Sequence, residues 1–137
     1  MVKSLIIALV LSANSHANSE INCLALNIYH EARGESPQGQ QAVAAVTINR
    51  VRSKQFPSSI CSVVWQNKQF SWTHTQKNYY PENTVAWKNA LAIAQKTISG
   101  DEKHKNILYF HNKSSNPYWT KSVNFVASVG NHLFYSK

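Results

Sequence analysis

Acidic side chains are scarce in this chain of 137 residues, which carries 6 of them against 14 lysines and arginines. The resulting net charge of +8, with histidines neutral, favours polyanionic partners, a class that includes nucleic acids, anionic membranes and bacterial cell walls. Charge alone does not choose among these partners, and it could simply serve solubility. Because acids are so few, Glu31 and Glu35, which lie close together, are the first candidates for chemistry.

Cysteine is equally sparse, and no CxxC pair occurs, which argues against a structural zinc site. His30-Glu31 does not open a zinc-protease HExxH motif, because Gly34 stands where the second histidine would fall. We therefore expect no metal and no cofactor. The two cysteines, Cys23 and Cys61, either form a disulfide after export or remain buried thiols. A disulfide would close a loop of roughly 40 residues and contribute about 4 kcal/mol in the chain-entropy model.

The chain also lacks an apolar run of the roughly 20 residues that a membrane-spanning helix needs. Its N-terminus instead has Lys3, the apolar run Leu5–Leu11, and Ser15-His16-Ala17 in the small-x-small form of a signal-peptidase site. We predict a cleavable export signal over residues 1–17, with an uncleaved anchor or a buried strand as alternatives. Residues 18–137 then form one compact domain that meets a membrane only transiently, through the signal.

Hydrophobic spacing predicts an α+β fold that is mostly helical, with a small hairpin or sheet near the C-terminus. Capping residues and apolar periods place helices from about Ser19 to Arg33, from Ser36 through Ile48, from Ser58 or Ser59 through Trp65, and from Asn83 or Thr84 to Gly100. The core stripe expected in the last of these comprises Trp87, Ala90, Leu91, Ala94 and Ile98. Strands are expected at Ile107–Phe110 and His132–Tyr135. The aromatic segment 66–81 shows neither the helical nor the strand period of apolar residues, so we expect a functional loop there.

Glu31 falls in the last turn of the first predicted helix, three residues after Ile28 and seven after Leu24. This spacing places it at the edge of the buried face of the helix. Partial burial and the negative end of the helix dipole both disfavour the carboxylate anion. Both effects raise the pKa of Glu31 and push it towards acting as an acid.

Glu35 follows Gly34, where the helix is expected to stop, and should be more solvated than Glu31. It could bind Arg33 or Arg50, contact an amide of a substrate, or order the turn through a salt bridge. We take it as the competitor of Glu31 for the catalytic role.

The stretch from Leu26 to Phe70 and the C-terminal stretch of the chain resemble the family of bacterial cell-wall hydrolases typified by the spore-cortex-lytic enzyme SleB. The matching residues are Glu31-Ala32-Arg33-Gly34-Glu35, Gly39-Gln40, Ala42-Val43-Ala44, Val46, Asn49-Arg50-Val51, Phe56-Pro57, Val63, Gln69-Phe70, Tyr109-Phe110, Asn112, Pro117 to Trp119, and Gly130 to Phe134. One departure is Ser36-Pro37, where the family more usually has proline directly after the second glutamate. We also find no separate wall-binding domain of the kind many members carry.

This resemblance implies a lysozyme-like catalytic domain and an exported lytic transglycosylase that cuts peptidoglycan between N-acetylmuramic acid and N-acetylglucosamine. In such an enzyme one glutamate protonates the glycosidic oxygen and then takes the proton of the attacking C6 hydroxyl, leaving a 1,6-anhydromuramic end. Glu31 is accordingly the predicted catalytic acid and base, with Glu35 as support. We expect a monomer in the periplasm, cell wall or medium, with peptidoglycan and not nucleic acid as its partner.

Sugar rings stack on aromatic side chains, and acetamido groups bind amides and hydroxyls. The candidate substrate contacts are Gln69, Phe70, Ser71, Tyr118 and Trp119, although core packing explains Phe70 equally well. Three alternatives stay open: a hydrolytic muramidase of the same fold, a non-catalytic basic protein that binds walls or polyanions, and a zinc amidase, which the missing metal spacing disfavours. Wall remodelling, cortex lysis and phage lysis by an endolysin all fit.

Overall fold

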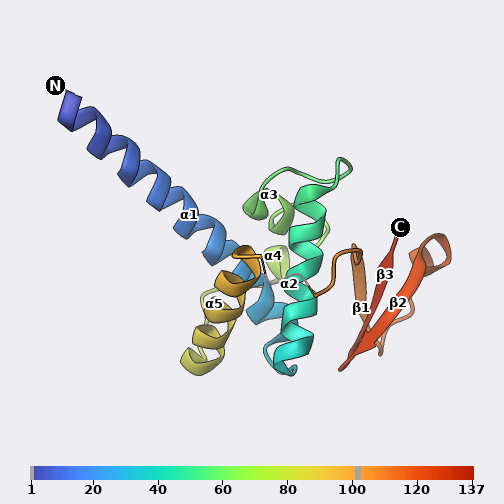
Figure 1. The fold of residues 1–137 in the computed structure, drawn as a ribbon. Helices are drawn as coiled ribbons and strands as arrows, with labels where there is room; N and C mark the ends of the chain where they lie inside the picture. The colour runs from blue at the N-terminus through green and yellow to red at the C-terminus, as the bar shows by residue number, and fades with distance from the viewer. Residues whose placement is uncertain (1, 101–102) are drawn as a thin grey trace.

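The computed structural model describes the backbone of residues 2–100 and 103–137, and the side chains of residues 16–100 and 103–137. The elements are α1 (Val2–Ala32), α2 (Pro37–Arg52), α3 (Ile60–Val64), α4 (Trp72–Thr75), α5 (Thr84–Ile98), β1 (Tyr109–Asn112), the 3₁₀ helix η1 (Tyr118–Ser122), β2 (Asn124–Val129) and β3 (His132–Ser136). The helices gather beside an antiparallel sheet of order β1-β3-β2 (Figure 1). The predicted α+β fold, mostly helical with a C-terminal sheet, is confirmed.

Helix α1 is longer than the helix predicted from the sequence, which was expected to begin near Ser19. Its N-terminal half projects away from the other elements (Figure 1). The side chains of residues 1–15, which carry most of the predicted export signal, lie outside the described residues. Within the described part of the chain, none of the helices combines the length and the apolar character needed to cross a membrane.

Three helices begin where their capping residues predict. The side chains of Ser36, Ser59 and Asn83 each accept a hydrogen bond from the backbone N–H three residues ahead, at the starts of α2, α3 and α5. Pro37 follows Ser36 at the first position of α2. These side chains satisfy N–H groups that the start of a helix leaves without an intrahelical partner.

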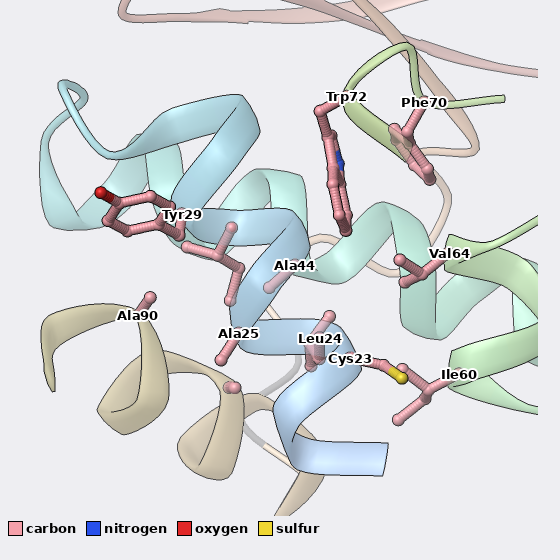
Figure 2. Packing of buried hydrophobic residues seen from close by; sticks show 12 residues of the cluster. Cys23, Leu24, Ala25, Tyr29, Ala44, Ile60, Val64, Phe70, Trp72 and Ala90 are labelled. Atoms are coloured by element: carbon pink, nitrogen blue, oxygen red, sulfur yellow. The ribbon is translucent and has the colours of Figure 1, made fainter. Parts of the chain in front are cut away.

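The main core surrounds the last turns of α1, where Leu24, Ala25 and Ile28 are fully buried. Around them pack Ala44 of α2, Ile60 and Val64 of α3, Phe70 and Trp72 around α4, and Ala90 and Ala94 of α5 (Figure 2). The middle of α2 is buried on most sides, as predicted. One core prediction is wrong, because Ile98 is the last residue of α5 and remains 40% exposed.

A disulfide joins Cys23 of α1 to Cys61 of α3, so these two residues are not free thiols. The carboxylate of Glu20 accepts hydrogen bonds from the backbone N–H groups of Ile60 at 2.6 Å and of Cys61 at 3.4 Å. Short helix α3 is therefore fixed to α1 both covalently and by a carboxylate at its N-terminal end.

The long loop after α3 contains the single turn α4, which the sequence did not predict, and it is anchored to α1 at three points. Trp72 Nε1 donates to Asn27 Oδ1 at 2.9 Å, and His30 Nε2 lies 2.7 Å from the carbonyl oxygen of Tyr79. Tyr29 Oη accepts hydrogen bonds of 3.1 and 3.2 Å from two N–H groups just before α5. The loop is thus ordered by the helix that carries Glu31.

The sheet differs from the sequence prediction in two ways. The first strand begins at Tyr109 rather than Ile107, because Ile107 is 1% exposed and fills a second core against Val43 and Val46 of α2. Strand β2 was not predicted. It is an edge strand whose side chains are mostly exposed, with Phe125 at 60%, so it lacks the alternation that marks a half-buried strand.

The turn between β2 and β3 is tied to the connection between α1 and α2 by Glu35. The backbone N–H of Asn131 donates to the Glu35 carboxylate, 3.2 Å from Oε1 and 3.4 Å from Oε2. Gly130 has φ of +57°, and a Cβ there would lie 2.5 Å from Glu35 Oε2. The expectation that Glu35 binds Arg33 or Arg50 is therefore wrong.

We predict that Gly130→Ala lowers the free energy of unfolding by about 1–3 kcal/mol, because alanine is strained at this φ and displaces the Glu35 carboxylate. Gly34→Ala is the matched control, since a Cβ at Gly34 meets no atom within 4 Å. It should change stability by no more than about 0.5 kcal/mol. Urea unfolding of both variants checks this, and equal effects would contradict the role given to the turn.

Candidate active site

A cleft of about 460 Å³ opens between the loop before α4 and the sheet. It is lined by Glu31, Arg50, Lys68, Gln69, Phe70, Ser71, His74, Phe110, His111, Asn112 and His132. A second hollow of about 320 Å³ includes Tyr29, Arg33 and Trp72 and shares Glu31 and Ser71 with the cleft. Glu31 therefore stands where the two hollows meet.

The carboxyl group of Glu31 is largely buried and reaches the cleft from the last turn of α1. Among the described residues, none donates a hydrogen bond to it. Burial raises the pKa of Glu31 to about 7, although the positive charge of Arg50 acts in the opposite direction. This is the direction that the helical spacing predicts. Near neutral pH the side chain is thus present in both its acid and its base form.

Arg50 is 5% exposed, and two of its N–H donors are engaged by neighbouring residues. Nε donates to the carbonyl oxygen of Leu108 at 2.8 Å, and Nη1 donates to Gln69 Oε1 at 3.2 Å. The guanidinium carbon lies 4.9, 5.4 and 5.8 Å from the ring centres of Phe56, Phe70 and Tyr109. Burial lowers the pKa of Arg50 to about 10, so it stays charged at neutral pH.

Four of the residues proposed from the sequence line the cleft, namely Glu31, Gln69, Phe70 and Ser71. Phe70 is only 4% exposed and belongs to the main core as well, so both of its suggested roles apply.

The structure does not bring Tyr118 and Trp119 to either hollow. Tyr118 is 87% exposed, and Trp119 packs against Tyr109, His111 and Tyr135. Tyr135 alternates along β3 with Phe134, which lies in the second core, so Tyr135 and Trp119 lie on the face of the sheet that is turned away from that core.

Sequence reasoning missed most of the sheet side of the cleft, where Phe110, His111 and Asn112 of β1 and His132 of β3 contribute. His132 is 4% exposed, and its Nδ1 lies 3.5 Å from Glu35 Oε1. The family-like segments around Tyr109-Phe110 and Gly130 to Phe134 contained these residues, but nothing local indicated that they converge. In the described part of the chain, no group of three His, Cys, Asp or Glu side chains is placed to hold a metal ion.

Residues 34–135 match the family model described as Cell Wall Hydrolase. Spore cortex-lytic enzymes are similar in sequence. That of Bacillus cereus is 32% identical over 124 residues, covering 88% of this chain and 46% of the relative. That of Bacillus subtilis is 31% identical over 119 residues, covering 86% of this chain and 38% of the relative. The chain thus spans less than half the length of these relatives.

Two solved structures are similar in fold. The catalytic domain of the germination-specific lytic transglycosylase SleB from Bacillus anthracis has a TM-score of 0.71 and 31% identity, covering 85% of this chain and 93% of that domain. The catalytic domain of the Bacillus cereus SleB protein has a TM-score of 0.70 and 30% identity, covering 87% of this chain and 91% of that domain.

The raised pKa of Glu31 predicts a pH-dependent effect of Glu31→Gln on stability. The folded protein holds this proton more tightly than the unfolded chain, so the wild type loses stability as pH rises from about 4.5 to about 7. The glutamine variant lacks this loss and should be up to about 3 kcal/mol more stable than wild type at pH 8. The difference should vanish near pH 4. Urea unfolding at the two pH values measures it, and an equal difference at both would refute the buried acid.

Proposed function

Because this chain belongs to the cell wall hydrolase family, we propose that it is a lytic transglycosylase that cleaves peptidoglycan between N-acetylmuramic acid and N-acetylglucosamine. The observation that carries this proposal is Glu31, a largely buried carboxyl group with a pKa of about 7, placed where two hollows meet. A glycan strand laid along both hollows would pass its scissile bond over this group.

Protonated Glu31 would donate its proton to the glycosidic oxygen as the bond from that oxygen to C1 of the muramic residue breaks. The C6 hydroxyl of the same residue then attacks C1, and the Glu31 carboxylate takes the hydroxyl proton. The product is a 1,6-anhydromuramic end, and Glu31 is again protonated. A pKa near 7 suits both steps, since the group must give and take a proton at the same pH.

The second glutamate supports this mechanism over hydrolysis by a carboxylate pair. A two-carboxylate glycosidase needs both groups at the scissile bond, about 5 Å apart or somewhat wider. Glu35 does not line the cleft, and its carboxylate accepts hydrogen bonds from Asn131 in the β2–β3 turn. Among the residues that the structure describes, Glu31 is thus left as the one carboxylate in the cleft lining.

Other cleft residues suit a glycan that carries amides and carboxylates. Ser71 lines both hollows and can bond an acetamido or hydroxyl group on either side of Glu31. Lys68 and Arg50 supply positive charge, which favours the lactyl and peptide carboxylates of peptidoglycan. We propose Gln69 and Phe70 as walls of the same binding site.

The test is digestion of purified peptidoglycan, with the fragments identified by mass spectrometry. Wild type should release anhydromuropeptides, and Glu31→Gln should lower the rate by about 10²–10⁴-fold, the usual contribution of a general acid and base. Glu20→Gln is the matched control, because Glu20 caps α3 and lies outside both hollows. Fragments with free reducing ends would indicate the muramidase, and binding without solubilisation would indicate a non-catalytic wall-binding protein.

We also propose that the protein is exported, because its substrate lies outside the cytoplasmic membrane and residues 1–17 have the pattern of a signal. The disulfide between Cys23 and Cys61 supports this, since disulfides persist in oxidising compartments. N-terminal sequencing of the protein recovered from a secreting cell should begin at Asn18. Recovery of the intact N-terminus from the cytosol would contradict the proposal.

A further inference from the structure

Glu35 and His132 form a buried pair behind the cleft whose geometry the proposed mechanism does not use. His132 is 4% exposed, and its Nδ1 is fully enclosed without a hydrogen-bond partner. Glu35 Oε1 lies 3.5 Å from this atom, slightly beyond hydrogen-bond distance. A small closure would therefore pair the two groups.

The Glu35 carboxylate is held in place facing the ring. Its oxygens accept the N–H of Asn131, the residue directly before His132. On the other side, Gly39 brings its backbone so close that a Cβ there would lie 3.0 Å from Glu35 Cβ. The carboxylate is thus fixed between the start of α2 and the start of β3.

This arrangement decides which ring nitrogen of neutral His132 carries the proton. If Nδ1 were unprotonated, its lone pair would face a carboxylate at 3.5 Å in a buried setting, which is repulsive. With the proton on Nδ1, the N–H dipole points at the negative charge, the usual way in which a carboxylate sets a histidine tautomer. Nε2 then carries the lone pair.

His132 also lines the cleft, and Nε2, unlike Nδ1, is not among the enclosed atoms that lack a partner. The ring is steadied by Phe110, which it meets edge-on with the centroids 5.2 Å apart. Burial lowers the pKa of His132; Glu35 opposes this shift, and His111 adds to it. The neutral ring therefore offers Nε2 to the cleft as a hydrogen-bond acceptor.

The cleft has few other free acceptors among its described side chains. Gln69 Oε1 accepts from Arg50, and Asn112 Oδ1 accepts from the N–H of Ser114. Glu31 must act as a donor when it protonates the glycosidic oxygen. A glycan, which presents hydroxyl and amide donors, needs an acceptor at this wall.

We infer that Glu35 is a positioning residue that keeps the proton on His132 Nδ1, so that His132 Nε2 accepts a hydrogen bond from a hydroxyl or amide N–H of the bound glycan. This inference rests on the proposed function for the identity of the ligand. The tautomer itself can be measured without substrate.

The first experiment is ¹⁵N NMR of the histidine rings in the intact protein near neutral pH. In wild type, His132 should show a protonated Nδ1 and an unprotonated Nε2. In Glu35→Gln the side-chain amide can donate to Nδ1, so a fraction of His132 should change to the opposite tautomer. Exposed His74 is the internal control and should not change. A protonated Nε2 in wild type would overturn the inference.

The second experiment compares two substitutions of His132, each of which places a side-chain amide near the position of one of the two ring nitrogens. The amide of His132→Asn reaches the position of Nδ1 but not that of Nε2, whereas His132→Gln can place its amide oxygen near Nε2. We expect His132→Asn to lower kcat/KM on peptidoglycan about 10-fold to 100-fold, as for one lost hydrogen bond to a polar group. His132→Gln should recover a large part of that loss.

Circular dichroism and urea unfolding establish that both variants are folded, and equal kcat/KM values for the folded variants would overturn the inference. If His132→Asn does not fold, binding of a soluble peptidoglycan tetrasaccharide to Glu31→Gln replaces this comparison. Bound sugar should shift the ¹⁵N signal of Nε2 and leave that of Nδ1 in place, and an unmoved Nε2 signal would overturn the inference. A wild type with the expected tautomer but no cleaving activity would refute the proposed function and leave the Glu35–His132 pair intact.

Discussion

The burial of the last turns of α1 is the constraint on which the rest of the structure depends. Leu24, Ala25 and Ile28 are fully enclosed by α2, α3 and α5, so this part of the helix can neither rotate nor shift without opening the core. Glu31 lies one helical turn beyond Ile28 on nearly the same face. Its carboxyl group is therefore held at the rim of the core, and the raised pKa follows from that position rather than from any special partner.

The same helix also builds one wall of the cleft. Asn27, Tyr29 and His30 of this helix hold the loop that carries Gln69, Phe70 and Ser71. Phe70, Trp72 and Tyr79 of the loop pack against the main core, and these hydrogen bonds tie the loop to α1 in addition. Acid and binding wall are thereby positioned by a single rigid element, which keeps their relative geometry fixed.

The features that were predicted correctly from the sequence are those determined by residues close together in the chain. The caps Ser36, Ser59 and Asn83 marked helix starts correctly, because a capping bond spans three residues. The position of Glu31 at the edge of the core was predicted in the same way, from its spacing of three residues after Ile28 and seven after Leu24 on one helix.

Pairings across the chain left no local signal. Glu35 meets Asn131, 96 residues away, and no pattern around either residue indicates the other. Strand β2 and the outer-face position of Trp119 depend likewise on how the sheet packs, which local periodicity does not encode. The sequence therefore located the catalytic candidate but not the opposite wall of its cleft.

The relation between Glu31 and Arg50 explains how a buried acid can keep its proton beside a positive charge. A free arginine would form an ion pair with the carboxylate and hold its pKa low. Arg50 instead donates to Leu108 and Gln69 and lies over three aromatic rings, and it forms no ion pair with Glu31. Arg50 thus affects the pKa of Glu31 only through the electrostatic field of its positive charge. Burial therefore outweighs the charge of Arg50 and raises the pKa of Glu31, and in the proposed mechanism the same fixed charge would stabilise the carboxylate that forms when Glu31 gives up its proton.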